Sequence, residues 1–210
     1  MRQPRDLLYA TIRRFRRDRM ATFQRLFPLT SKTRILDVGG TSLNWGLIAG
    51  RPDVTLLNLP TDGVANVVGD GRYLPFRDRS CDIVFSNSVI EHISLPSDQQ
   101  RFADEVRRTG RAYWVQTPDY RFPIEPHLVT PFLHWLPKGV RLAIARRFTF
   151  WSLLERPSPD RWEYYIRHCA EEVRLLDARQ LQALFPEAQI IRERFLGLSK
   201  SLIAVAGARK

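Results

Sequence analysis

The sequence predicts an α/β fold, a doubly wound and mostly parallel sheet of about seven strands with helices on both faces. Short, almost continuously apolar runs alternate with helical segments, as expected for a sheet that is buried on both sides. The first of these runs leads directly into a pair of glycines. The length of 210 residues suits one such domain with its own core. We therefore expect residues 1–210 to form a single domain.

The N-terminal segment, residues 1–28, predicts a basic amphipathic helix over residues 6–27. Its apolar side chains recur at helical spacing: Leu8, Ile12, Phe15, Phe23 and Phe27. Arginines occupy the opposite, solvent-facing side: Arg13, Arg14, Arg16, Arg17 and Arg19. Pro28 ends the helix. The helix is interpreted as packing on the domain, with a lid or an element that contacts anionic lipid as alternatives.

The next segment, residues 34–117, contains most of the expected sheet. The predicted strands are short and apolar: Arg34–Val38, Val54–Asn58, Ala65–Gly69, Asp82–Ser86 and Arg111–Gln116. Two helices are predicted between them, over Ser42–Ala49 and over Pro96–Arg108, the second ended by Gly110. This alternation indicates parallel βαβ units.

Residues 118–168 break this pattern with seven prolines and many aromatic and arginine side chains. They predict a helical insertion of loops and short helices that covers a site rather than extending the sheet. Regular pattern returns over residues 172–206. A helix over Ala178–Phe185 is capped by Asp177, and strands over Gln189–Arg194 and Ser201–Ala206 are close enough to form an antiparallel hairpin.

Composition limits the class of protein and its partners. The net charge is +11, and 29 of the 33 basic residues are arginine. Such an excess fits nucleic acid, an anionic membrane or a phosphorylated substrate, and equally fits solvated arginines. Cys81 and Cys169 offer neither a disulfide framework nor metal-ligand spacing, so we name no metal ligands. Without a transmembrane run or a signal peptide, we expect a cytoplasmic protein, with peripheral membrane contact left open.

Ligands of open parallel sheets bind outside the carboxyl ends of the strands. Glycines or polar residues follow each of the first four predicted strands there: Gly39 and Gly40, Asn58, Asp70 and Gly71, and Ser86, Asn87 and Ser88. Glycines allow the backbone to approach a ligand closely. The chain lacks both G-x-G-x-x-G and a G-x-x-x-x-G-K-S/T phosphate loop, which disfavours an NAD-dependent oxidoreductase.

In this order and spacing, four stretches resemble the class I S-adenosylmethionine-dependent methyltransferases, and more closely their type 11 branch. They are ILDVGGTSLNW (35–45), VTLLNLP (54–60), VVGDGRYLPFRDRSCDIVFSNSVIEHI (67–93) and RAYWVQTP (111–118). The resemblance implies a Rossmann-like fold and S-adenosylmethionine as the cofactor, bound by residues 34–117. The last strand, SLIAVA, is also similar to that of the family.

The resemblance also implies roles for individual residues. Asp37 would hold the amino end of the donor's methionine, beside the backbone of Gly39, Gly40 and Thr41. Asn58 would meet the ribose hydroxyls and Leu59 the adenine. Asp70 and the Gly71 amide would bind the adenine edge, and the floor near the sulfonium would be lined by Ser86, Asn87 and Ser88. Two departures predict weaker binding: D-V-G-G-T replaces the usual D-x-G-x-G, and Asn58 replaces an acidic residue.

Methyl transfer from a sulfonium is an in-line displacement, so the protein chiefly positions the acceptor and excludes water. A protonated acceptor also needs a general base, for which His127, His92, Glu125 and Glu91 are candidates; packing roles stay open for each. The insertion is expected to select the acceptor. We expect an oxygen or nitrogen of a small-molecule or lipid-linked compound. Nucleic acid is an alternative acceptor, although no N-P-P-Y motif follows the fourth strand. A non-catalytic Rossmann-like binding module is a second alternative.

Overall fold

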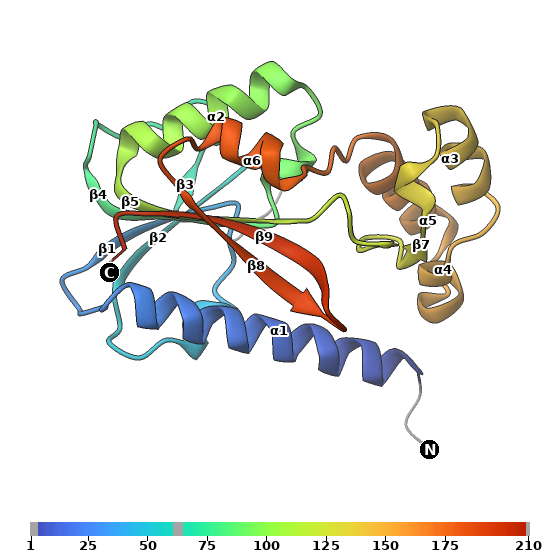
Figure 1. Cartoon of the computed structure of the whole chain (residues 1–210), viewed down its shortest axis with the longest axis horizontal. Coiled ribbons are helices and arrows are strands. Elements are labelled where there is room, and N and C mark those ends of the chain that lie inside the picture. The colour runs from blue at the N-terminus through green and yellow to red at the C-terminus, as the bar shows by residue number, and fades with distance from the viewer. Residues whose placement is uncertain (1–3, 61–64, 209–210) are drawn as a thin grey trace.

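The computed structural model describes residues 4–60 and 65–208, and it contains a seven-stranded sheet of order β3-β2-β1-β4-β5-β9-β8 (Figure 1). The strands are β1 (Arg34–Val38), β2 (Asp53–Asn58), β3 (Val67–Val68), β4 (Cys81–Asn87), β5 (Gly110–Pro118), β8 (Gln189–Phe195) and β9 (Leu198–Ala206). β1 to β5 pair in parallel, whereas β9 pairs antiparallel with both β5 and β8. The fold class predicted from the sequence, including its C-terminal hairpin, is confirmed.

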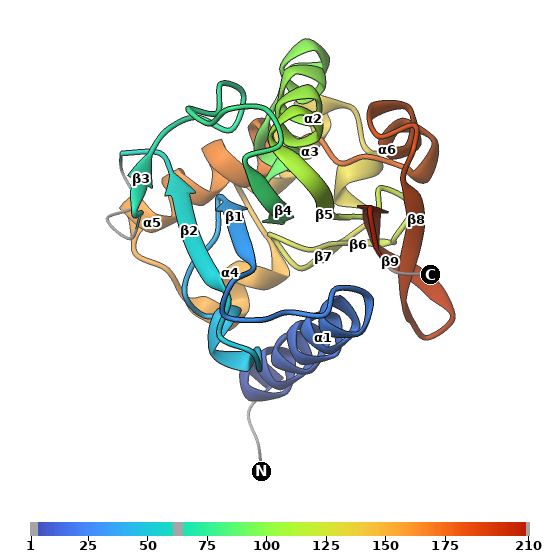
Figure 2. The ribbon, with the colours of Figure 1, turned by 90° about the vertical axis from the view of Figure 1, so that its left-hand side faces the viewer.

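Helices cover both faces of the sheet (Figures 1 and 2). The helix α1 (Pro4–Leu26) packs on one face, and α2 (Pro96–Thr109) and α6 (Ala178–Leu184) pack on the other. Under α1 the core is aromatic, because the fully buried ring of Phe23 meets Phe85 and Trp114 edge to face at centroid distances of 5.1 and 5.5 Å. Such pairs stabilise the fold beyond the area that they bury.

One arginine of α1 differs from its predicted place on the solvent side. Arg13, Arg14 and Arg17 are exposed as expected, but Arg19 is only 9% exposed. Its guanidinium donates two hydrogen bonds of 2.7 Å to the carboxylate of Glu193 in β8. Periodicity alone missed this contact, because the ion-pair partner lies at the other end of the chain. α1 is thereby fixed to the sheet.

The helix predicted over Ser42–Ala49 is wrong. The structure forms only a short 3₁₀ turn there, η1 (Trp45–Leu47), with no side-chain cap at Asn44. Gly46 lies in the middle of the segment and disfavours a regular helix. The indole of Trp45 donates to the Asp37 carboxylate at 2.8 Å, which holds this segment against the end of β1.

The insertion gathers beyond the carboxyl end of β5, and therefore beyond the carboxyl ends of the parallel strands (Figure 1). It contains β6 (Ile124–Glu125), β7 (Thr130–Pro131), η3 (Leu133–Trp135), α3 (Lys138–Ala145), α4 (Phe150–Glu155), α5 (Pro159–Tyr165) and the π-helical η4 (Ile166–Glu171). β6 and β7 pair only with each other, so the main sheet is not extended. Leu128, Leu133 and Ile166 belong to a separate small core of the insertion.

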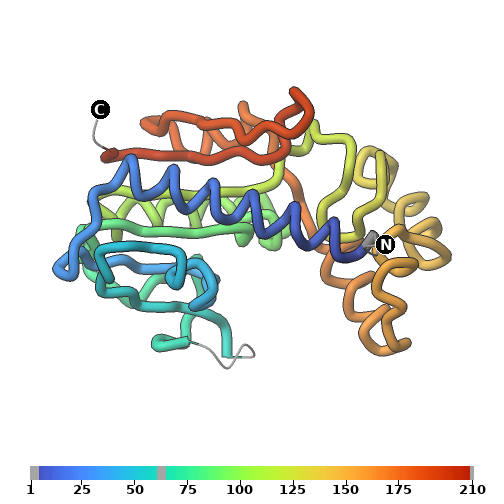
Figure 3. The backbone as a smooth tube through the Cα atoms, turned by 90° about the horizontal axis from the view of Figure 1, so that it is seen from below, coloured from blue at the N-terminus to red at the C-terminus, as the bar shows by residue number. Residues whose placement is uncertain are grey.

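The first turns of α1 lie beside the insertion (Figure 3). Tyr9 donates a hydrogen bond of 2.7 Å to Glu155 at the end of α4, and Arg5 lies 3.2 Å from the same carboxylate. α1 thus joins the sheet to the insertion. Over the described residues, no helix combines the length and the apolar character needed to cross a membrane.

Candidate active site

A cavity of about 490 Å³ opens at the carboxyl ends of β1, β2, β3 and β4 and is floored by the start of α2. Several of the residues singled out from the sequence line it: Gly39, Asn58, Leu59, Asp70, Gly71, Ser88 and His92. Apolar walls come from Val38, Leu57 and Phe102. The topology therefore brings residues from four separate strand ends to one cavity, which we call the donor cavity.

The glycine loop requires residues without a side chain. Gly39 has φ +75°, and a Cβ there would lie 2.4 Å from a methyl group of Val89. A Cβ on Gly40 would lie 1.8 Å from the Asp37 carboxylate. The backbone of the loop is therefore packed directly against Asp37 and cannot tolerate alanine at either glycine without moving.

Asp37 is a buried carboxylate with an unsatisfied oxygen. It is fully buried, its Oδ2 accepts the Trp45 indole, and its Oδ1 has no partner. Burial raises the pKa of Asp37 to about 7, although the hydrogen bond from Trp45 opposes the shift. A buried acceptor of this kind is costly unless it is paired. An ammonium group that reached it would gain both charge and a hydrogen bond.

The structure gives a reason for an asparagine at position 58, where the family that the sequence resembles usually has an acidic residue. Nδ2 of Asn58 donates a hydrogen bond of 2.8 Å to the carbonyl of Gly40, so the side chain ties β2 to the glycine loop. An aspartate could not make this bond, because an ionised carboxylate only accepts. Among the described residues none donates a side-chain hydrogen bond to Oδ1 of Asn58, a residue that lines the donor cavity.

Asp70 lies at the rim of the donor cavity in an ion pair. Arg72 contacts it at 2.6 Å and also reaches Asp98 in α2 at 2.6 Å. The hydrogen bonds from Arg72 hold the pKa of Asp70 below its ordinary value, against the effect of partial burial. Asp70 is therefore an ionised acceptor whose position is fixed by Arg72, which is itself held by Asp98.

The three polar residues at the end of β4 play different parts. Ser86 is buried and donates to the carbonyl of Val38 at 3.1 Å, and Asn87 accepts from Arg19. Ser88 has φ +57° and donates to Gln116 at 2.9 Å. Only Ser88 of the three lines the cavity, and the predicted residues Asp37, Gly40, Thr41, Ser86 and Asn87 do not line it.

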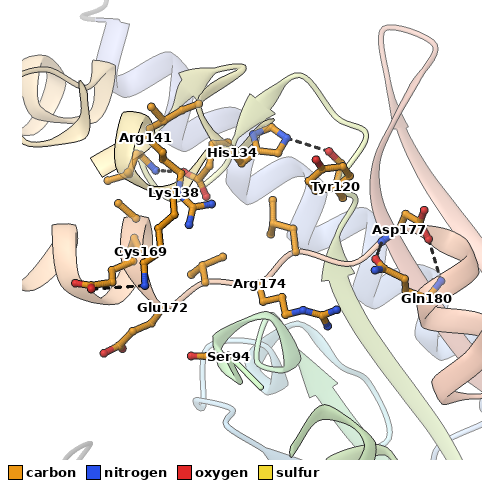
Figure 4. A pocket seen from close by; sticks show the side chains of 17 residues that line it. Ser94, Tyr120, His134, Lys138, Arg141, Cys169, Glu172, Arg174, Asp177 and Gln180 are labelled. Carbon is orange, nitrogen blue, oxygen red and sulfur yellow. Dashed lines mark hydrogen bonds and ion pairs between the residues drawn. The ribbon is translucent and has the colours of Figure 1, made fainter. Parts of the chain in front are cut away.

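A second cavity of about 600 Å³ lies between the insertion and the segment that leads into α6 (Figure 4). Its lining combines apolar and charged side chains, among them Leu128, Leu133, His134, Lys138, Arg141, Glu172 and Arg174. Ser94 lines both this cavity and the donor cavity. The two spaces therefore adjoin each other at Ser94, and we call the second one the acceptor cavity.

Three of the four candidate bases, His92, Glu125 and His127, lie together near this junction. His92 lines the donor cavity and Glu125 the acceptor cavity. The ring of His127 lies between them, edge to face with that of His92 at a centroid distance of 4.9 Å. Nδ1 of His127 lies 2.7 Å from Oε1 of Glu125. Glu91, the fourth candidate base, is fully buried beside them.

These groups shift one another's protonation. Burial lowers the pKa of His127, but the charge and hydrogen bond of Glu125 outweigh it and raise the pKa overall. His92 keeps an exposed face, yet desolvation of its ring by the surrounding residues, together with the neighbouring His127, lowers its pKa to about 4. Burial raises the pKa of Glu125, yet its contacts with His127 lower it overall. The Glu125–His127 pair is thus suited to accept a proton near neutral pH.

Comparison with known proteins agrees with this geometry. Residues 51–112 match the model of a family described as a methyltransferase domain. Uncharacterized proteins from two strains of Mycobacterium tuberculosis are 41% identical over 54 residues. The aligned part is 26% of this chain, and the chain spans only 18% of the length of each relative.

Solved structures share the fold over most of the chain. A protein from Pyrococcus horikoshii has a TM-score of 0.55 at 16% identity, covering 90% of this chain and 88% of that one. A SAM-dependent methyltransferase from Archaeoglobus fulgidus has a TM-score of 0.52 at 12% identity, with coverages of 93% and 94%. The N-terminal domain of EvdMO1, solved with SAH bound, has a TM-score of 0.51 at 19% identity. The match covers 92% of this chain and 81% of that one.

The resemblance inferred from the sequence is therefore confirmed. Residues 51–112 match a methyltransferase family model and the fold is shared with a solved SAM-dependent methyltransferase, so the chain is similar to the class I S-adenosylmethionine-dependent methyltransferases.

Proposed function

We propose that the protein transfers a methyl group from S-adenosylmethionine, held in the donor cavity, to an oxygen or nitrogen of an acceptor in the acceptor cavity. The observation that carries this proposal is the junction of the two cavities at Ser94, with His92 and His127 beside it. An acceptor that extends from the insertion toward the sulfonium passes these imidazoles. The donor supplies its own activated carbon, so the chain's contribution is alignment and exclusion of water.

The donor would be held by groups that line the donor cavity and by Asp37, which is buried directly against the glycine loop. The unpartnered Oδ1 of Asp37 can accept from the donor's ammonium, and Oδ1 of Asn58 can accept from the ribose. Asp70 can accept from the adenine amine, between the apolar surfaces of Leu59 and Phe102. These positions follow the order that the resemblance implies along the strand ends.

His127 would remove the acceptor's proton when the acceptor is a hydroxyl. Glu125 holds Nδ1 of His127, so its Nε2 is left to face the junction. As the methyl group forms its bond to the acceptor oxygen, the proton of that hydroxyl would move to Nε2 and the sulfonium would leave as a neutral thioether. The candidate residues His92, Glu125 and His127 would thereby act together in one site.

The acceptor cavity suits an amphipathic anion. Arg141 lines it with a buried Nε that has no hydrogen-bond partner, and it forms no ion pair with any residue the structure describes. Lys138, by contrast, lies 3.7 Å from Glu171. A phosphate or carboxylate on the acceptor would satisfy Arg141, while Leu128 and Leu133 would contact an apolar part. A small-molecule or lipid-linked acceptor with an anionic group fits this lining best.

Contact with a membrane surface is the second part of the proposal. Large apolar side chains of the insertion are exposed on and between α3 and α4: Val140, Ile144, Phe148, Phe150 and Leu153. Arg146 and Arg147 are exposed among them. Exposed apolar groups beside arginines are typical of elements that lie on anionic lipid. Sedimentation with phosphatidylglycerol vesicles but not with phosphatidylcholine vesicles is expected, and a Phe148→Ser, Phe150→Ser double variant should stay in solution.

The activity is tested by incubating the protein with methyl-labelled S-adenosylmethionine and one of three acceptor pools. The pools are a lipid extract that contains polyprenyl phosphates, a water-soluble metabolite extract, and total RNA. Label is expected in one of the first two, and His127→Ala should reduce it at least about 100-fold. His168→Ala is the matched control, because His168 also contacts a glutamate, Glu172, at 2.7 Å. Label in RNA alone, or in none of the pools, would contradict the proposal.

A further inference from the structure

A cluster of Glu91, His92 and His127 lies where the donor and acceptor cavities adjoin, and we call it the Glu–His–His cluster. One carboxylate oxygen and one ring nitrogen from each histidine all lie within 4.8 Å of one another. Glu91 and His92 come from the single turn η2 (Ile90–His92), and His127 follows β6 in the insertion. The approach of the insertion to η2 therefore assembles the cluster.

Glu91 points to a missing cationic partner. Its side chain is fully buried, its Oε2 accepts from Thr117 Oγ1 at 3.0 Å, and its Oε1 has no hydrogen-bond partner. A buried carboxylate with an open oxygen is strongly unfavourable unless a cation or a donor meets it. Within the part of the chain that the structure describes, Glu91 forms no ion pair with lysine or arginine, so a bound cation would satisfy it.

His127 has the arrangement of a metal-binding histidine. The ionised Glu125 carboxylate can only accept, so Nδ1 of His127 carries the proton of their 2.7 Å hydrogen bond. Nε2 therefore presents its lone pair to the cluster. A carboxylate behind an imidazole fixes the tautomer and strengthens the nitrogen as a ligand. Glu125 is itself held by the backbone amide of Leu128.

We propose that the Glu–His–His cluster binds one divalent transition-metal cation, with Zn²⁺ as the reference ion, through Glu91, His92 and His127. Two imidazoles and one carboxylate are a ligand set for zinc or iron rather than for magnesium or calcium, which prefer oxygen. Bonds of about 2.0–2.2 Å bring tetrahedral ligand atoms to roughly 3.5 Å from one another. His92 is exposed and can rotate to close the remaining gap.

Three protein ligands leave a coordination position open, as in catalytic zinc sites. That position would face the junction of the cavities, where the cation could polarise an acceptor hydroxyl and lower its pKa. In the loaded protein the cation, and not Nε2 of His127, would then activate the acceptor. Binding itself is measured without donor or acceptor, so this inference stands or falls separately from the proposed methyl transfer.

The test is calorimetric titration of Zn²⁺ into protein that has been treated with a chelator and dialysed, with Mg²⁺ as the comparison ion. One equivalent of Zn²⁺ is expected to bind, and Mg²⁺ is expected to bind far more weakly. Glu91→Gln, His92→Ala and His127→Ala should each weaken Zn²⁺ binding at least about 10-fold, and Glu125→Gln should do so by about 10–100-fold. His168→Ala should leave binding unchanged, since His168 contacts Glu172 outside the cluster.

Circular dichroism of each variant checks that the fold is kept, and Co²⁺ substitution gives an independent readout. The visible spectrum of bound Co²⁺ should be lost in His92→Ala, whose exposed side chain can be removed without disturbing the core. Absence of stoichiometric Zn²⁺ binding would overturn the inference. So would Zn²⁺ binding that all the cluster variants retain, because the ion would then lie elsewhere.

Discussion

Replacing Asp37 by asparagine should make the protein more stable at alkaline pH and less able to bind its donor. The carboxyl of Asp37 has a pKa raised by burial from 3.8 to about 7. Each pKa unit corresponds to about 1.4 kcal/mol, so keeping this group ionised costs the folded state about 4 kcal/mol well above pH 7. Asparagine keeps the shape and the acceptor for Trp45, and carries no charge to desolvate.

The sign follows from the raised pKa. The folded protein holds the proton more tightly than the unfolded chain, so the wild type loses stability as pH rises from about 4 to about 7. Between pH 5 and pH 8 this group should cost the wild type roughly 2.5 kcal/mol that Asp37→Asn does not lose. Any cost of packing the amide is the same at both pH values and cancels from the comparison.

The assay is urea unfolding of both proteins at pH 5 and pH 8, without ligand. The stability of Asp37→Asn relative to the wild type should rise by roughly 2.5 kcal/mol over that interval. Calorimetry should show S-adenosylhomocysteine binding to the variant about 10–100 times more weakly, the loss expected for a hydrogen bond to a charged group. Parallel pH dependence of the two proteins would refute the reasoning, because Asp37 would not then be an unpaired buried carboxyl.

Three further substitutions test the donor cavity and the helix that supports it. Gly71→Ala would place a Cβ 2.8 Å from the buried ring of Phe102. Calorimetry should show that this variant binds S-adenosylhomocysteine at least about 10-fold more weakly. The control variant Gly139→Ala, where the added Cβ meets open space, should bind it normally. Arg19→Met breaks a buried ion pair and should lower the free energy of unfolding by about 3–5 kcal/mol in urea melts, whereas Arg17→Met should not. Asp70→Asn should weaken donor binding several-fold, and unchanged affinity would remove Asp70 from the adenine site.

The strands and the places where they end were predictable because they follow from local sequence. The apolar run over β1 and the glycines after it locate one edge of the site without further information. Asn58 lines the donor cavity. Its use in holding the glycine loop was not foreseen, since that bond depends on how closely β2 packs beside the carbonyl of Gly40.

The catalytic region was predictable only as separate residues. His92 and His127 carried no shared motif, and their contact arises from the packing of the insertion on η2. The burial of Arg19 was not predictable either, because nothing in the local sequence distinguishes it from the neighbouring solvated arginines. Its ion-pair partner, Glu193, is brought to it only by the fold. Long-range contacts of this kind depend on tertiary packing, and periodicity does not contain them.

Calorimetric titration of the ligand-free protein with S-adenosylmethionine, S-adenosylhomocysteine and NAD tests the central claim most directly. The geometry of the donor cavity predicts that the first two ligands bind with a stoichiometry of one, that Gly71→Ala weakens both, and that NAD gives no heat. Binding of NAD with no response to S-adenosylmethionine would contradict the assignment of this cavity to a methyl donor.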